Sequence, residues 1–148
     1  MLDLEAVLKE WDSDAEISEH ELDKASRHTP KLHAKYLQYL SLAKLSLKRA
    51  ENAQKCLLKD KWLYYNGKMD RETLVAKGWN PDPFDGLKVL KGEMDYYYES
   101  DPEIQQSEDR IAYLKTLIDT LNEIVQTLRW RHATIKNVID WRRLESGG

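Results

Sequence analysis

The chain has 148 residues and a formal net charge of −3, with 33% charged and 41% hydrophobic residues. Its six glycines and four prolines are few for this length, which is typical of long solvent-exposed helices and argues against a compact sheet protein. The single cysteine, Cys56, excludes an intramolecular disulfide and a cysteine-based metal site, so we expect a reducing intracellular compartment. The N-terminus is acidic and no run of roughly 18 apolar residues occurs, so we expect neither secretion nor a membrane span.

Helix-start signals recur near the beginning of the chain. We expect a first short helix over about Leu2–Trp11. Ser18 and Glu21 have the spacing of a capping box and predict a second helix that starts near Glu19. Thr29-Pro30 is a further start signal, because proline is tolerated in the first turn of a helix.

Two series of apolar residues with spacings of four and three, here called seams, predict two long helices. The first helix runs to about Asn66-Gly67, and its seam comprises Tyr36, Leu40, Ala43, Leu47, Ala50 and Leu57. The second opens at Asp101-Pro102, and its seam comprises Ile104, Ile111, Leu114, Ile118, Leu121, Val125 and Leu128, with the polar Ser107 filling the missing position. We therefore expect an all-α fold with a long, coiled-coil-like helical hairpin.

The remaining segments complete a single expected domain, 1–148, with helices in 1–66, a connecting region in 67–101 and further helices in 102–148. Within the connecting region we expect a short helix over Arg71–Ala76 and a brief extended piece at Tyr96–Tyr98. The amphipathic segment Thr134–Leu144 is too short to be a stable helix alone in water. Its apolar face either folds back onto the seam or pairs with copies of itself.

Charge is gathered locally, and residues 31–68 carry nine Lys and Arg against two acids. On an ideal helix four of these lysines fall within about 60° of one another, on the side of Trp62 and about 115° from the seam. This basic stripe comprises Lys44, Lys48, Lys55 and Lys59. Cations beside an exposed aromatic ring are typical of single-stranded nucleic-acid binding, although the stripe could equally be the solvated face of an amphipathic helix.

Lys61 does not join the basic stripe, because it lies about 200° from Lys59, on the seam side. Three explanations stay open: the helix ends before Lys61, its flexible stem reaches around, or a neighbouring subunit completes the site. Tyr64 and Tyr65 are interpreted mainly as packing residues, which leaves Trp62 as the better stacking candidate.

Catalytic chemistry is not indicated. The chain has no glycine-rich phosphate loop and no nucleophile elbow, and His28 and His33 are five residues apart, not the four that place two metal ligands on one helical face. We therefore expect no enzymatic activity, no bound metal and no cofactor.

Two segments resemble the UvsY family of recombination mediators of T-even phages. Ala53-Gln54-Lys55 followed by Leu58-Lys59-Asp60-Lys61-Trp62-Leu63-Tyr64-Tyr65-Asn66-Gly67 is similar to the family's Leu-Lys-Ala-Arg-Leu-Asp-Tyr-Tyr-Ser-Gly run. Ile135–Gly147 is similar to the family's C-terminal ending. Helix order and chain length also agree, but Lys61 stands where the family has Arg, and His132 stands where it has a helix-ending Gly.

The resemblance implies a ring-forming protein, heptameric or alternatively hexameric, that binds single-stranded DNA in the cytoplasm of an infected bacterium. It would serve DNA recombination, repair and replication by helping a RecA-type phage recombinase replace the phage single-strand-binding protein. The family's DNA-contacting residues map onto Lys59 and Lys61. Its oligomerisation segment maps onto Ile135, Val138, Ile139, Trp141 and Leu144.

Two other functions remain open at this point. A structural or scaffolding protein of a phage particle would use coiled-coil surfaces to bind protein only, and no single-stranded DNA. A packaging adaptor would prefer duplex DNA.

Overall fold

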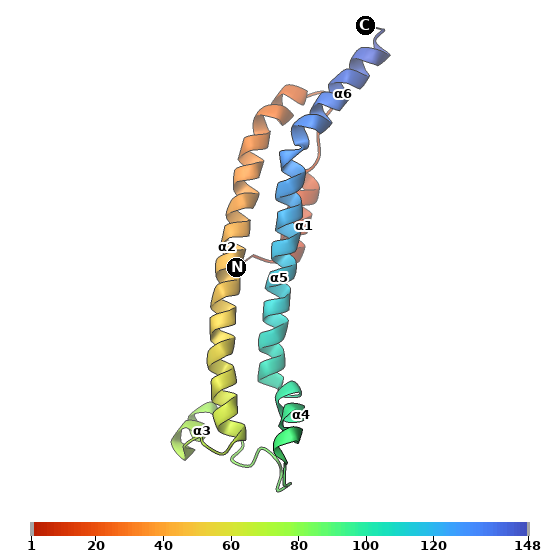
Figure 1. The fold of residues 1–148 in the computed structure, drawn as a ribbon. Coiled ribbons are helices and arrows are strands. Elements are labelled where there is room, and N and C mark those ends of the chain that lie inside the picture. The colour runs from red at the N-terminus through yellow and green to blue at the C-terminus, as the bar shows by residue number, and fades with distance from the viewer. Residues whose placement is uncertain (1, 148) are drawn as a thin grey trace. The chain divides into compact units, whose positions relative to one another are not determined.

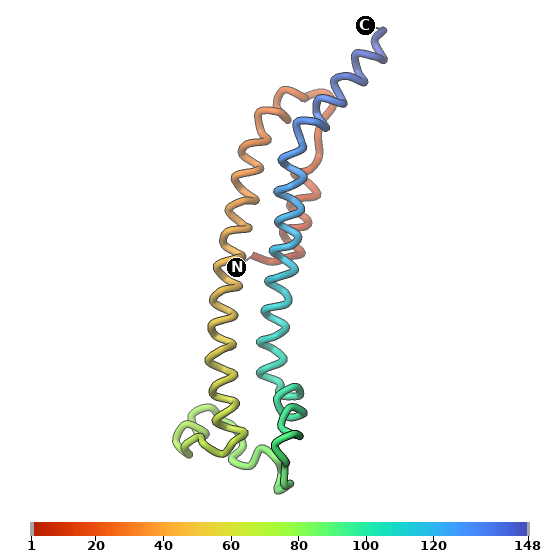
Figure 2. Tube along the Cα trace, in the orientation of Figure 1, coloured from red at the N-terminus to blue at the C-terminus, as the bar shows by residue number. Residues whose placement is uncertain are grey.

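The computed structural model describes residues 2–147, and over this range it contains helices and no strand (Figure 1; Figure 2 traces the same path along Cα). The elements are α1 Leu4–Asp14, α2 Leu22–Tyr65, α3 Arg71–Lys77, the 3₁₀ turn η1 Lys91–Glu93, α4 Met94–Glu99, α5 Pro102–Arg129 and α6 Arg131–Glu145. The predicted all-α class is confirmed. None of the described helices is long and apolar enough to cross a membrane.

The chain divides into two compact units, each of which uses part of α2 and part of α5. Unit 1 comprises Met1–Ser46 and Leu114–Gly148, and unit 2 comprises Leu47–Tyr113. Unit 1 therefore joins the two ends of the sequence, and unit 2 contains the connecting region. The expected single domain in three parts stays a prediction.

Helix α2 is one continuous helix, so the predicted start at Thr29-Pro30 is wrong. The helix begins at Leu22, about three residues beyond the predicted Glu19, and Pro30 lies inside it. The Thr29 hydroxyl donates to the carbonyl of Ala25 at 2.9 Å, as it does inside a helix. A proline removes one N–H and strains one turn, and the length of α2 outweighs that local cost.

The core of unit 1 follows both seams. The buried seam residues are Tyr36, Leu40 and Ala43 of α2 and Leu114, Leu121, Val125 and Leu128 of α5. Leu117 and Ile124 are also buried, outside the predicted seam. Helix α5 thus buries a face wider than a strict heptad seam, as helices of globular proteins do.

Polar contacts fasten α1 to its neighbours in unit 1. The Lys35 ammonium pairs with Glu10 at 2.7 Å and also with Asp14, whose carboxylate accepts the Tyr36 hydroxyl at 2.8 Å. Arg131, at the start of α6, donates to the Asp14 carbonyl at 3.0 Å. These contacts connect both ends of the sequence.

Two further helix boundaries differ from, or add to, what the sequence indicated. Tyr96–Tyr98 forms part of helix α4, so the predicted extended piece is wrong: the Ser100 and Asp101 N–H groups donate to the carbonyls of Tyr96 and Tyr98. At the other end of the chain, the break between α5 and α6 falls at Trp130 (φ −97°, ψ 0°), and the chain is helical again through His132. The predicted short helix in the connecting region is confirmed as α3.

Candidate nucleic-acid interface

The basic stripe is exposed on α2. In unit 2, Lys48, Lys55 and Lys59 face solvent, and Trp62 at the end of the row is 47% exposed. Within residues 2–147 no carboxylate forms an ion pair with any of these three lysines. Lys44, which belongs to unit 1, is exposed as well. These side chains are therefore free to meet a polyanion.

A residue that the sequence reasoning missed lies beside Trp62. The Lys68 ammonium sits 4.6 Å from the centre of the Trp62 ring, a cation–π contact. Lys68 lies beside Trp62 because α2 ends in a Schellman motif, which turns the chain back along the helix. In this motif Gly67 adopts φ +66°, and the Lys68 N–H donates to the Leu63 carbonyl at 2.8 Å. The Asn66-Gly67 pair is the sequence signal that could have located it.

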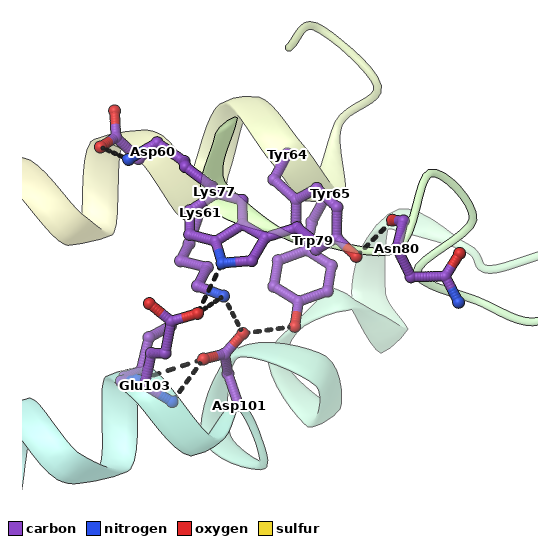
Figure 3. A network of polar contacts seen from close by, with 10 residues as sticks. Asp60, Lys61, Tyr64, Tyr65, Lys77, Trp79, Asn80, Asp101 and Glu103 are labelled. Atoms are coloured by element: carbon purple, nitrogen blue, oxygen red, sulfur yellow. Dashed lines mark hydrogen bonds and ion pairs between the residues drawn. The ribbon is translucent and has the colours of Figure 1, made fainter. Parts of the chain in front are cut away.

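Lys61 lies on the opposite side of α2 and is 3% exposed. Its ammonium contacts Asp101 at 2.9 Å and Glu103 at 3.3 Å, and lies 3.8 Å from the centre of the Trp79 ring (Figure 3). A DNA phosphate could reach this ammonium only by displacing these groups. Direct DNA contact by Lys61 stays a prediction, and the structure gives Lys61 other partners.

Asp101 is the centre of these contacts. One of its oxygens accepts the N–H groups of Glu103 and Ile104 at 2.9 and 3.1 Å, which makes it the cap at the start of α5. The other oxygen accepts the Tyr65 hydroxyl at 2.6 Å and faces Lys61. Burial alone would raise the pKa of Asp101, but the Tyr65 hydrogen bond and Lys61 outweigh it and hold that pKa below 3.8.

The connecting region is attached to the same place. The Trp79 indole N–H donates to Glu103 at 2.5 Å, and the Tyr64 hydroxyl donates to the Asn80 carbonyl at 2.6 Å (Figure 3). Tyr64 and Tyr65 are both buried, as their interpretation as packing residues predicted. We call Lys61, Tyr65, Trp79, Asp101 and Glu103 the Lys61 clasp.

The residues predicted for oligomerisation fall into two groups. Ile135 is 4% exposed and belongs to the core of unit 1, while Val138 and Ile139 are half-buried. Trp141 and Leu144 are 64% and 69% exposed on the last turns of α6. Two large apolar side chains that a helix exposes to solvent offer a contact surface for another copy of the chain.

Comparisons with known proteins agree on one family. The family model described as "Recombination, repair and ssDNA binding protein UvsY" matches residues 10–148. "Recombination protein uvsY" of Enterobacteria phage T4 is 25% identical over 144 residues, which is 97% of this chain and 98% of that protein.

Solved structures also match. Two crystal structures of the bacteriophage T4 recombination mediator protein UvsY superpose with TM-scores of 0.79 and 0.77. Their sequence identities are 23% and 24%, and the matches cover 99% and 97% of this chain and 99% of each T4 chain. At these identities the structures establish a shared fold.

Proposed function

This chain belongs to the UvsY family of recombination, repair and single-stranded DNA-binding proteins, and from this premise we propose how it works as a recombination mediator. It holds single-stranded DNA and helps a RecA-type phage recombinase displace the phage single-strand-binding protein. The action is non-enzymatic and takes place in the cytoplasm of the infected bacterium. Membership of this family favours mediation over the scaffolding alternative.

One observation carries the DNA-binding part of this proposal: the exposed, uncompensated lysines beside an exposed tryptophan on unit 2. Lys48, Lys55 and Lys59 supply charge for the sugar–phosphate backbone, and Trp62 offers a ring face on which a base can stack. Lys68, whose ammonium lies 4.6 Å from the centre of the Trp62 ring, adds a cation beside the stacking position. Lys44 is a further candidate for a phosphate contact.

We also propose that copies of the chain assemble into a ring, as a heptamer or alternatively a hexamer. Trp141 and Leu144 are the exposed apolar candidates for this contact, with Ile135, Val138 and Ile139 shaping the helix that presents them. A ring repeats the lysine row, and linked weak sites bind a single strand far more tightly than one site does.

An acidic surface is available for protein partners. Besides Glu103 of the clasp, five carboxylates around α4 and the first half of α5 are exposed: Glu93, Asp95, Glu99, Glu108 and Asp109. This surface would repel DNA, so we assign it to the recombinase or the single-strand-binding protein.

A salt titration of oligothymidylate binding, followed by fluorescence anisotropy, tests the DNA-binding proposal. If one protomer neutralises three phosphates, the affinity falls with the logarithm of salt with a slope of about −2 per protomer, at about 0.7 per phosphate. Lys59→Ala then lowers the slope to about −1.4, because one contact is lost. Trp62→Ala weakens binding by about 1–3 kcal/mol and leaves the slope unchanged, because stacking releases no counterion.

Lys88→Ala is the matched control, since it removes one exposed lysine that belongs to the connecting region and not to the lysine row of α2. It is expected to leave both affinity and slope unchanged. Binding that does not respond to salt, or a Lys88 variant as weak as the Lys59 variant, contradicts the proposed interface.

A further inference from the structure

We propose that Lys61 is a positioning residue for DNA binding, which fastens the last turn of α2 to the start of α5 and does not itself contact the strand. This inference rests on the proposed DNA-binding function. It concerns a residue of the motif that the family resemblance would assign to phosphate contact.

The charge around Lys61 argues against a phosphate contact. One ammonium faces two carboxylates, Asp101 and Glu103, at 2.9 and 3.3 Å, so the formal charge of the three groups together is −1. A phosphate that approached Lys61 would meet this net negative charge at short range. The Trp79 ring, 3.8 Å from the ammonium, occupies a further side.

Helix geometry explains what Lys61 positions. Lys59 precedes it by two residues and Trp62 follows it directly, so both project away from the side of α2 that carries Lys61. When the clasp holds Lys61 and Tyr65 against α5, Lys59 and Trp62 are turned outward and stay exposed. A rotation of this turn that released Lys61 would move the two DNA-contacting side chains.

The clasp also ties the last turn of α2 to two other parts of the chain, the start of α5 and the loop after α3. Asp101 caps α5 with the same carboxylate that binds Lys61 and Tyr65, and Glu103 holds Trp79 of the loop after α3. The ion pairs of Lys61 therefore fix the orientation of Lys59 and Trp62 on the DNA-binding face. Loss of the Lys61 charge is expected to let these two side chains move, without removing a phosphate contact.

The same anisotropy titration tests this inference on three variants of the full-length oligomer: Lys61→Met, Asp101→Asn and the double variant. A positioning role predicts that either single variant weakens binding by about tenfold with an unchanged salt slope, and that the double variant is little weaker than either one. A direct contact predicts a slope that is smaller by about 0.7 per protomer in Lys61→Met. It also predicts tighter binding in Asp101→Asn, because the ammonium loses a competing carboxylate. Either of the last two results overturns the proposal.

If circular dichroism shows that Lys61→Met does not fold, two milder variants distinguish the positioning role from a direct contact. Tyr65→Phe removes one hydroxyl from the clasp and no charge, so a positioning role predicts weaker binding at constant slope, and a direct contact predicts no change. Lys61→Arg keeps the cation beside Asp101 and is expected to restore binding to within about threefold of the parent chain. The proposal is contradicted if Lys61→Arg loses binding, or if Tyr65→Phe binds as tightly as the parent chain.

Lys59→Ala separates this inference from the function on which it rests. If Lys59→Ala lowers the salt slope, and the clasp variants weaken binding without lowering the slope, both proposals hold. If every variant, Lys59→Ala included, keeps the parent slope and affinity, the proposed interface fails. If Lys59→Ala and Lys61→Met lower the slope equally, only the positioning role fails.

Discussion

Replacement of Asp101 by asparagine should destabilise the protein by about 3 kcal/mol, because it breaks a buried ion pair from one side. The Asp101 and Lys61 side chains are only 2% and 4% exposed, so solvent does not screen their interaction at 2.9 Å. Removal of one member of such a pair typically costs about 3–5 kcal/mol. Glu103 stays at 3.3 Å from Lys61, which places the expected cost at the lower end of that range.

The asparagine keeps most of the remaining geometry and thereby isolates the charge. Its side-chain oxygen still accepts the N–H groups of Glu103 and Ile104, and asparagine is as good a helix cap as aspartate. Its amide N–H₂, however, would point at the Lys61 ammonium, which can only donate. Asp101→Ala removes the cap as well and should cost about 1 kcal/mol more than Asp101→Asn.

Urea unfolding at one fixed protein concentration measures both costs, since assembly makes apparent stability depend on concentration. Tryptophan fluorescence is a suitable signal because Trp79 lies against Lys61 in the clasp, and circular dichroism reports the helices as a whole. A loss of less than about 1 kcal/mol in Asp101→Asn, within the range of an exposed pair, would refute the argument from burial.

Three further outcomes follow from the same structure. Pro30→Ala should raise the free energy of unfolding by about 2–3 kcal/mol in urea titrations, because it restores a backbone donor inside α2; an unchanged midpoint would show that the proline is unstrained. Burial raises the pKa of Asp14, but hydrogen bonds from Lys35 and Tyr36 outweigh it and lower that pKa below 3.8. The stabilisation is therefore complete above pH 3.8 and lost as pH falls through the lowered value, so acid titration should destabilise the parent chain more than Asp14→Asn. Trp141→Asp should lower the mass in sedimentation and leave helicity unchanged, and an unchanged mass would remove Trp141 from the assembly contact.

The long helices could be predicted from the sequence because their signals are local and repeated. The first residue of α5 was located at Pro102 from Asp101-Pro102, since a cap involves residues two or three positions apart. Single-residue signals were less reliable. Pro30 predicted a start inside a helix of 44 residues, and three consecutive tyrosines predicted an extended piece where the chain is helical. At Pro30 the length of the continuous helix outweighs local preference, and at Tyr97 and Tyr98 ring contacts with Tyr65 hold the helical turn.

The candidate site was predictable in part for the same reason. Helical angles separated Lys61 and Tyr65 from the basic stripe, and the structure buries both residues. The partners of Lys61 were not predictable. Trp79 and Asp101 are 18 and 40 residues further along the chain, and the path of the connecting region decides that they meet Lys61.

The division between the two faces of α2 explains why assembly matters for the proposed function. From Lys48 to Lys59 the exposed row of unit 2 rises over 11 residue steps, or about 16 Å of helix, so in the proposed interface one copy contacts only a few phosphates. Lys61, two residues beyond this row, is held in the clasp, and in our proposal it adds no contact but fixes the direction of the others. Because Lys61 cannot leave the clasp without breaking its contacts to Asp101 and Glu103, we expect tighter binding to come from more copies, each with the same lysines held in the same orientation.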